Sequence, residues 1–453
     1  MDFTLSSRYV CPMQKGTMNH FIKRLAGATF TLCSFAIASS SLLTAAQETA
    51  DQTPKLSNHQ PRYDVHGMLL PWTSWNDALE REMQWYLKCP MEHGYPRFVT
   101  LTFMDGNYGA IEKRRDTIPA MQNGTGIFSY LKYYTYTGKK DIRYLQFAQY
   151  QGDYLVKESL TPNEGKYPRF TRSTGTRGQF PQAPDAGSQR DGRYEIEPDK
   201  GGIAGYALAV LYEATKEQKY LNQALQNARV LTANMRPGDA THSPWPFRVD
   251  FRTGEGHGDV GANTAYTLRL FDKLVELNYG EFKAPREALW HWVKQYQIPN
   301  AQKDGSLWVQ FFEDYDRPDN KNAWSPLSLA RYLVEKKEAV DADWREDART
   351  LIDFVNKHFT SVRNGVLVCG EQDHDLKPWG GVLSTYGATL AVYSKETGSN
   401  EFKGIAWQAL NYALYAINDD GCPSQHALEP GRGGWQEDAH TDKIHNFVVA
   451  LTA

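Results

Sequence analysis

Apolar and polar positions along this chain form helical hairpins that recur about every sixty residues. Each hairpin opens with small residues, continues as an apolar stretch, and breaks at a short polar turn before a second, amphipathic helix. Five copies are visible, and they begin near Gly124, Gly201, Gly261, Ser325 and Ser384. Equal spacing of self-similar helical pairs indicates a stacked or closed helical array.

Two further helices lie at the ends of this pattern and have no partner in sequence. One is predicted from Trp72 to Leu87, and the other from Asp438 to the last residue. If these two pack together, the chain has six helical hairpins, and we expect an all-α fold, an (α/α)6 toroid with six inner and six outer helices. An open solenoid is the alternative, but it needs polar capping ends. The apolar segment NFVVALTA at the end of the chain favours closure.

The first residues carry the pattern of an export signal. Lys23 and Arg24 precede a long run of apolar and small residues, after which the composition becomes polar. We therefore expect a signal over residues 1–46, with a possible start at Met18, then a linker over 47–70 and a single toroid domain over 71–453. A retained membrane anchor is the alternative, and the Ser and Thr content of the run weakens it. The mature protein is expected in the periplasm or outside the cell, without stable membrane insertion.

Charge and cysteine content exclude several classes of protein. The 50 basic and 53 acidic residues nearly cancel, which removes the electrostatic case for nucleic-acid binding. Beyond the leader the chain has Cys89, Cys369 and Cys422, at spacings that suggest neither a zinc site nor a disulfide framework. A Cys369–Cys422 bridge and free buried thiols both remain open.

The connections between helices differ in length, and this predicts where a site lies. Turns from an inner to an outer helix are short, whereas connections from an outer to the next inner helix are long. The long connections all enter the N-terminal ends of inner helices, so they gather on one face, and long loops in compact domains are usually functional. The mouth of the toroid is therefore the expected pocket.

The contents of these loops fit a saccharide ligand. An indole face beside polar donors suits a sugar ring, and guanidinium groups recognise carboxylate or sulfate. Each side chain taken alone could instead pack its own loop or pair with a neighbouring carboxylate. The candidate substrate-binding residues are Tyr194, Arg193, His242, Trp245, Arg248, His257, Trp308, Trp379 and Trp435, with Trp324 at a loop–helix junction.

At this level the chain resembles the six-hairpin glycosidase-like superfamily. The resemblance is carried by small-residue-led inner helices such as GGIAGYALAVLYEATKEQKYL and STYGATLAVYSKETGSNEF, by the Trp-rich loops, and by the export signal. Members include glycoside hydrolases, polysaccharide lyases with toroid domains, and sugar epimerases. The resemblance implies a carbohydrate-active enzyme, but no motif transfers catalytic positions residue by residue.

Glycoside hydrolysis is the leading expectation for the chemistry. It needs a carboxylic acid and a second carboxylate roughly 5 to 9.5 Å apart. Glu371 or Asp373 from one loop, against Glu437 or Asp438 from the next, would supply such a pair, with His440 near the first turn of the last helix.

Elimination at a uronate is the alternative, because it needs a base and a group that neutralises the sugar carboxylate. Tyr194 with Arg190 or Arg193, or His242 and His257 with Arg248, could serve. A non-catalytic saccharide-binding toroid is a further hypothesis, and epimerisation is a distant one. We expect an acidic oligo- or polysaccharide as the partner. Since no calcium-loop or paired-histidine spacing occurs, we expect neither an obligatory metal nor another cofactor.

Overall fold

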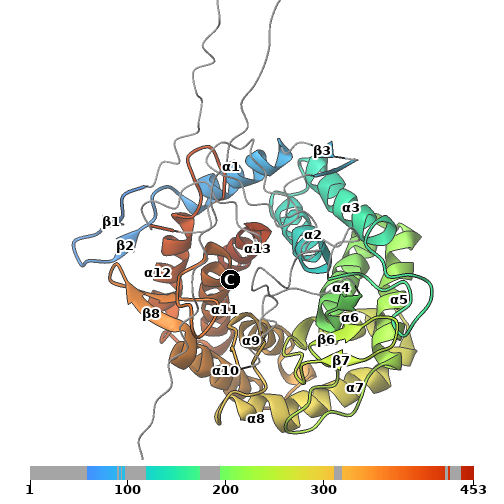
Figure 1. Cartoon of the computed structure of the whole chain (residues 1–453). Helices are drawn as coiled ribbons and strands as arrows, with labels where there is room; N and C mark the ends of the chain where they lie inside the picture. Colours follow the sequence, from blue (N-terminus) through green and yellow to red (C-terminus); the bar gives the residue numbers. More distant parts are fainter. Residues whose placement is uncertain are drawn as a thin grey trace, which may run out of the picture. The chain divides into compact units, whose positions relative to one another are not determined.

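The computed structural model describes residues 59–88, 91–92, 94–96, 119–173, 194–310, 319–423, 427–428 and 440–453. All of them belong to one compact unit that spans Gln52–Ala453. Within these ranges, long α-helices alternate between an inner and an outer position (Figure 1). The inner helices are α2 (Pro119–Tyr136), α4 (Pro198–Thr215), α6 (Ala265–Glu276), α9 (Trp324–Lys336), α11 (Gly380–Thr397) and α13 (His440–Leu451). The outer helices are α1 (Trp75–Leu87), α3 (Ile142–Lys157), α5 (Gln218–Ala233), α7 (Lys283–Trp292), α10 (Trp344–Phe359) and α12 (Lys403–Leu414).

The ends of the chain meet and close the ring. The last helix, α13, packs against α2 and α11, and it also contacts α1, the first helix. Glu82 of α1 and Lys443 of α13 are both fully buried, with 3.9 Å between the carboxylate and the ammonium group. Figure 1 shows α13 among the inner helices, beside α2 and α11. The predicted (α/α)6 toroid is therefore confirmed.

Small residues at the starts of the inner helices allow close packing. A Cβ atom added at Gly201 would lie 1.9 Å from Phe170 Cζ, and one added at Gly124 would lie 2.9 Å from Ile203 Cγ2. Because of this close approach α4 and α11 are buried on almost every side, whereas α5 and α10 bury one face and expose the other. Gly124 and Gly201 thus allow the neighbouring elements to approach more closely than any larger residue would.

Short antiparallel strands pair within the connections between the helices, and the hairpin pattern did not predict these strands. The strands are β1 (Arg62–Tyr63), β2 (Leu69–Leu70), β3 (Met91–Glu92), β4 (Tyr95–Pro96), β5 (Glu195–Ile196), β6 (Arg248–Asp250), β7 (Gly256–His257), β8 (Thr360–Arg363) and β9 (Val366–Cys369). They pair as β1–β2, β3–β4, β5–β6–β7 and β8–β9. The β5–β6–β7 sheet joins the loop that precedes α4 to the loop that precedes α6, with Ile196 opposite Val249. It therefore fixes two long connections at the mouth relative to each other.

Residues 59–70 pack on the outside of the ring, although they fall within the stretch expected to be a linker. Leu69 is fully buried, and its backbone N–H and carbonyl both bond the Gln408 side-chain amide of α12, at 2.7 and 3.0 Å. The first turn of α1 follows directly, with the Ser74 hydroxyl accepting from the Asp77 N–H.

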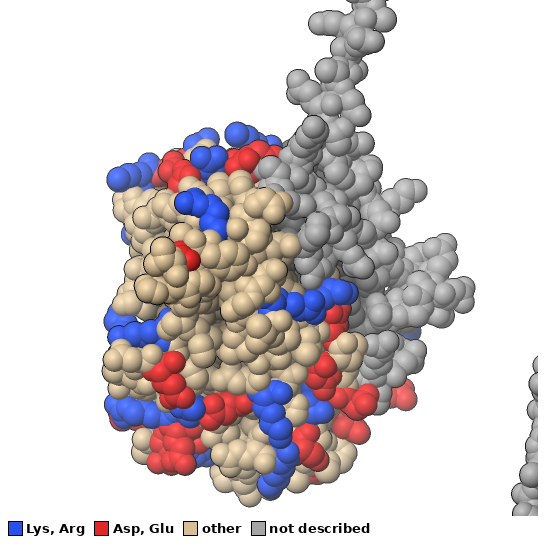
Figure 2. All heavy atoms as spheres, turned by 90° about the vertical axis from the view of Figure 1, so that its left-hand side faces the viewer, with Lys and Arg blue, Asp and Glu red and all other residues tan. Residues whose placement is uncertain are grey.

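Figure 2 shows the side of the molecule that carries β1, β2, β8 and α12. Uncharged surface occupies much of this side, and charged residues are denser toward its lower part. Several large apolar side chains are exposed on these elements, among them Val65, Val362 and Trp407. In the part of the chain that the structure describes, no helix combines the length and the hydropathy needed to span a membrane.

Candidate functional site

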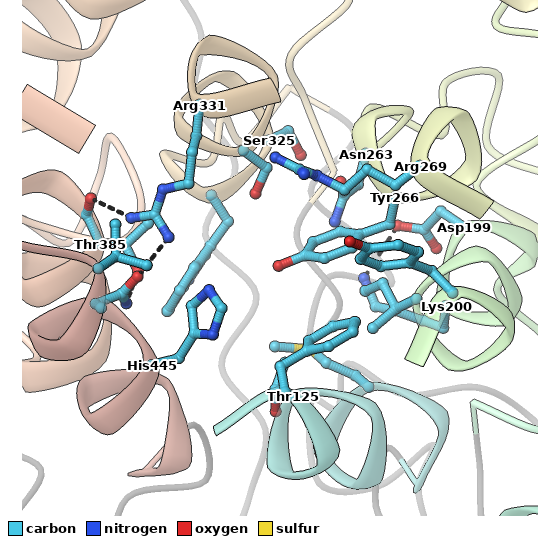
Figure 3. Close-up of a pocket in the computed structure, with 18 of the residues that line it drawn as sticks. Thr125, Asp199, Lys200, Asn263, Tyr266, Arg269, Ser325, Arg331, Thr385 and His445 are labelled. Atoms are coloured by element: carbon cyan, nitrogen blue, oxygen red, sulfur yellow. Dashed lines mark hydrogen bonds and ion pairs between the residues drawn. The ribbon is translucent and has the colours of Figure 1, made fainter. Parts of the chain in front are cut away.

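A cavity of about 400 Å³ lies on the inner side of the ring. All six inner helices contribute to its lining (Figure 3). Figure 3 shows Arg331, Thr385 and His445 on one side of this central cavity, with Tyr266, Arg269, Asp199 and Lys200 on the other. Its volume falls within the range typical of small-molecule sites, and the long loops enter beside it. The central cavity is thus the candidate functional site.

The wall nearest the mouth combines aromatic faces with polar atoms. Tyr266, Trp324 and Phe247 supply the aromatic faces. Asp199 Oδ1 and Asn263 Oδ1 are shielded from solvent, and neither has a hydrogen-bond partner among the described residues. Buried polar atoms are almost always bonded, so these two oxygens retain capacity for the hydroxyl groups of a ligand. The arrangement is the one expected for a sugar ring, which has apolar faces and a polar rim.

Lys200 is held in place at the same end of the cavity by two carboxylates. Its ammonium group lies 3.1 Å from Asp199 Oδ2 and 3.3 Å from Glu197 Oε2. Burial alone would lower the pKa of Lys200, but the carboxylates of Asp199 and Glu197 outweigh it and raise the pKa above its ordinary value. Lys200 therefore stays charged and orients Asp199 at the first turn of α4.

His445 lies deeper, on the inward face of α13. Its Nδ1 atom is shielded from solvent and has no hydrogen-bond partner among the described residues. Burial is the main cause that lowers the pKa of His445 well below its ordinary value, followed by the charges of Arg331, Lys132 and Arg269. The backbone of Phe128 acts in the opposite direction and does not compensate. The imidazole is therefore neutral at neutral pH, which leaves it a nitrogen lone pair that can accept a proton.

Four charged side chains from three helices line the cavity around His445, and we call them the charged tier. They are Lys132 of α2, Arg269 of α6, and Arg331 and Glu335 of α9. Arg269 Nη1 lies 2.5 Å from Glu335 Oε2. Burial would raise the pKa of Glu335, but Arg269, Arg331 and Lys132 hold it below its ordinary value. The tier therefore has three cations and one carboxylate.

Of the predicted catalytic carboxylates, Glu371 lies beside the central cavity. Its Oε1 atom accepts a hydrogen bond of 2.7 Å from the indole N–H of Trp324, which lines the cavity. Asp373 lies in the same loop, but its carboxylate is 3.5 Å from the Lys321 ammonium group, and Asp373 is not a lining residue. The structure thus brings one of this pair of candidates to the cavity.

Three of the predicted tryptophans lie in or against the core and do not line the central cavity. Trp308 is completely buried against Phe354, and Trp245 is buried with its indole N–H donating to the Leu231 carbonyl at 2.9 Å. Trp379 caps α11 and packs half-buried against the core. Among the described tryptophans, Trp324, at its loop–helix junction, is the one that lines the cavity.

The other described candidates belong to the β5–β6–β7 sheet and its neighbouring loops. Arg248 is buried, with its guanidinium 3.4 Å from Glu197 Oε1, and the Arg252 guanidinium covers the Tyr194 ring at 3.6 Å. His257 Nδ1 lies 3.6 Å from Glu195 Oε1. His242 Nδ1 lies 3.0 Å from Asp239 Oδ1 in the loop before β6. Each of these candidates contacts a residue of the sheet or of a neighbouring loop. None of them lines the central cavity.

The remaining candidates lie outside the described residues. Arg193, Trp435, Glu437 and Asp438 belong to this set, and of His440 only the backbone, at the start of α13, is described. Cys369 and Cys422 are both buried free thiols. Within the described ranges, no cluster of three His, Cys, Asp or Glu side chains could hold a metal ion.

Neither the charged tier nor His445 was among the predicted site residues, although the chain held a signal for the tier. Lys132 follows Thr125 and Phe128 at helical spacing on the inward face of α2, and Arg269 follows Tyr266 in the same way on α6. Charged residues on the face that the small and apolar residues turn inward are costly unless they are paired or used. The predicted site residues lie mostly in the long loops, and the charged side chains of the inner helices were not among them.

No protein-family model matches this chain, and no curated protein matches it. Among solved structures, a sugar epimerase from a ruminal bacterium is 12% identical, with a TM-score of 0.60, over 83% of this chain and 99% of the other. Cellobiose 2-epimerase from Bacillus thermoamylovorans B4167 is 13% identical, with a TM-score of 0.58, over 83% and 98%. A family 76 glycoside hydrolase from a bovine Bacteroides thetaiotaomicron strain is 14% identical, with a TM-score of 0.58, over 84% and 79%. At such identities the likeness shows the fold alone, and that fold is the (α/α)6 toroid.

Proposed function

We propose that this protein is a carbohydrate-active enzyme and that a sugar residue of its substrate occupies the central cavity. One observation carries the proposal, namely that aromatic faces and hydrogen-bond acceptors without described partners lie together on the cavity wall. A sugar ring offers apolar C–H faces to Tyr266 and Trp324 and hydroxyl groups to Asp199 and Asn263. Proteins of similar fold include a sugar epimerase, a cellobiose 2-epimerase and a family 76 glycoside hydrolase, which agrees with this class of substrate.

For the reaction, we propose proton abstraction beside the carboxylate of a uronate. A ring nitrogen of His445 takes the proton, the electron pair of the C–H bond forms a carbon–carbon double bond, and the adjacent glycosidic C–O bond breaks. The departing oxygen takes a proton from solvent, and His445 then releases its own. A neutral imidazole beside Arg331 and Lys132 supports this chemistry, because cations stabilise the negative charge that develops on the carboxylate. Among the described lining residues, the carboxylates are Asp199 and Glu335, and both are ion-paired.

Glycoside hydrolysis, the leading expectation from the sequence, is the second candidate. The position of Glu371 favours it, since the indole of Trp324 orients its carboxylate at the edge of the cavity. A second carboxylate would have to come from the adjoining loop that carries Glu437 and Asp438, at a separation of roughly 5 to 9.5 Å.

The two reactions give different products from a uronate polymer. Elimination creates a conjugated double bond that absorbs in the ultraviolet, whereas hydrolysis creates new reducing ends without that absorbance. His445→Asn should abolish the first, and Glu371→Gln should abolish the second. His291→Asn, an exposed histidine on the outer helix α7, is the matched control and should keep full activity. Saccharide binding without either product would leave the non-catalytic binding protein as the function.

We also infer that the protein acts outside the cytoplasm. The charged-then-apolar leader over residues 1–46 supports export, and polysaccharides are substrates that a cell meets at its exterior. Fractionation of cells that express the full chain, with amino-terminal sequencing of the mature protein, tests this. Recovery of uncleaved protein in the cytoplasm would contradict it.

A further inference from the structure

We propose that the charged tier is a binding site for one anionic substituent of the substrate, a carboxylate or a sulfate ester, and that Lys132 is its principal determinant. The inference deepens the proposed function and rests on it, because the substituent reaches the tier only if a sugar enters the central cavity.

The contacts of the tier single out Lys132. Arg269 is engaged by Glu335 at 2.5 Å. The guanidinium of Arg331 donates to Asn446 Oδ1 at 2.7 Å and to the Thr385 carbonyl at 3.3 Å. Lys132, by contrast, makes no hydrogen bond or ion pair within the described residues, although it lines the same cavity. Among the described residues, its ammonium group is therefore the cation of the tier that no hydrogen bond or ion pair engages, and it is available to a ligand.

The position of Lys132 on α2 argues against a side chain that only contacts solvent. Thr125, Phe128, Lys132 and Thr135 all line the cavity, so they share the inward face of the helix. Lys132 is half-buried there. Placing an ammonium group on an inward face is unfavourable unless its charge is balanced, and Glu335, the one carboxylate of the tier, is paired with Arg269 and shared by three cations. The exposed turn after α2 carries Lys139 and Lys140 without this cost. An anionic ligand would supply the counter-charge.

His445 gives a second and independent indication of a ligand. Its Nδ1 atom is buried and lacks a hydrogen-bond partner among the described residues. The charged residues that line the cavity around it are those of the charged tier, Lys132, Arg269, Arg331 and Glu335. Other titratable or polar residues there include Tyr206 of α4, Tyr266 of α6 and Thr385 of α11. On α1, Glu82 faces the Lys443 ammonium group. The groups around the imidazole therefore carry more positive than negative charge, and an anion bound among them would offset it.

The same geometry couples the anion to the proton on His445. A bound anion favours the imidazolium form, and by reciprocity the imidazolium form favours the anion. Binding of an anionic sugar should therefore strengthen as the pH falls, and binding of a neutral sugar should not. An acidic substrate would in this way raise the basicity of the residue that takes its proton.

Calorimetric titration of the full mature chain with D-glucuronate, glucose 6-sulfate and glucose tests the site. We expect one or both anionic sugars to bind at least about tenfold more tightly than glucose. Lys132→Met should remove that preference and leave glucose binding unchanged, and Lys132→Arg should retain part of it. Lys140→Met, in the exposed turn after α2, is the matched control and should behave as the unmodified protein.

The outcomes separate this site from the proposed function. A preference for both anions assigns the site to either group, and a preference for one identifies carboxylate or sulfate. Equal binding of all three sugars, or an anion preference that survives in a folded Lys132→Met variant, overturns the site and leaves the carbohydrate proposal standing. Absence of binding by any sugar overturns both. In His445→Asn the anion preference should lose its pH dependence, and a persistent dependence would contradict the coupling.

Discussion

The buried pair that joins the first and last helices offers the sharpest test of ring closure. Glu82 and Lys443 are both fully buried, 3.9 Å apart. At this separation, and with an effective dielectric constant of about 20, their attraction is about 4 kcal/mol. Lys443→Met keeps the length of the side chain but removes the ammonium group that lies 3.9 Å from the buried Glu82 carboxylate. Removal of one partner from such a pair typically costs about 3–5 kcal/mol.

The assay is thermal and urea unfolding of the mature chain. With an unfolding entropy of about 2.1 cal/mol/K per residue and about 400 folded residues, a loss of about 4 kcal/mol lowers Tm by about 5 °C. The double variant Glu82→Gln with Lys443→Met should recover part of this loss, because no buried charge is left.

A matched surface pair provides the control for this experiment. Arg229 and Glu281 also join neighbouring hairpins, at 2.9 Å, but their side chains are 56% and 50% exposed. Arg229→Met should therefore change stability by less than about 1 kcal/mol. If Lys443→Met unfolds like the Arg229→Met control, or if the double variant is as unstable as Lys443→Met, the buried pair does not stabilise the closed ring.

Three further predictions follow from the geometry. His445→Asn should lower turnover by about 10²-fold to 10⁴-fold, with unchanged circular dichroism, and full activity would remove His445 from the reaction. Burial and the neighbouring Asp341 raise the pKa of Asp347 from 3.8 to about 6. The folded state therefore keeps a proton that the unfolded state has already lost, and the free energy of unfolding should fall as the pH rises from 3.8 to about 6. Urea unfolding across the window should show that Asp347→Asn removes this fall, and an unchanged pH profile would contradict the assignment. Gly201→Ala places a Cβ atom 1.9 Å from the buried Phe170 ring and should cost about 1–3 kcal/mol in urea unfolding, whereas a neutral result would mean that the ring can move aside.

The hairpin pattern predicted the fold because the signals for helices and turns lie within each repeat. Small residues such as Gly201 and Gly202 mark where an inner helix must approach its neighbours, and polar turns such as the one before Gln218 mark where the chain reverses. The predicted starts differ from the observed ones by a few residues; α4, for example, begins at Pro198 and not at Gly201. Pro at the first turn of a helix, where its missing N–H costs nothing, was the local signal for that start.

The site was harder to predict, because a loop residue reveals its chemistry only through what it contacts. Trp308 and Trp324 look alike in sequence, yet Trp308 is wholly buried and Trp324 lines the central cavity. Arg248 looked like a recognition group for an anion, and it is buried beside Glu197. The composition of a loop does not predict which of its side chains are buried in the core and which line the cavity.

By itself, the sequence determined the helical hairpins, their number and the closure of the ring, because periodicity and small residues act within and between neighbouring repeats. Only the tertiary structure decided which residues face the axis together. Lys132 and His445 are 313 positions apart in the chain, with Arg331 between them, and all three line one cavity because α2, α9 and α13 are brought around the same axis. Their mutual charge and burial exist only after the ring has closed, and from these the pKa of His445 and the availability of Lys132 arise.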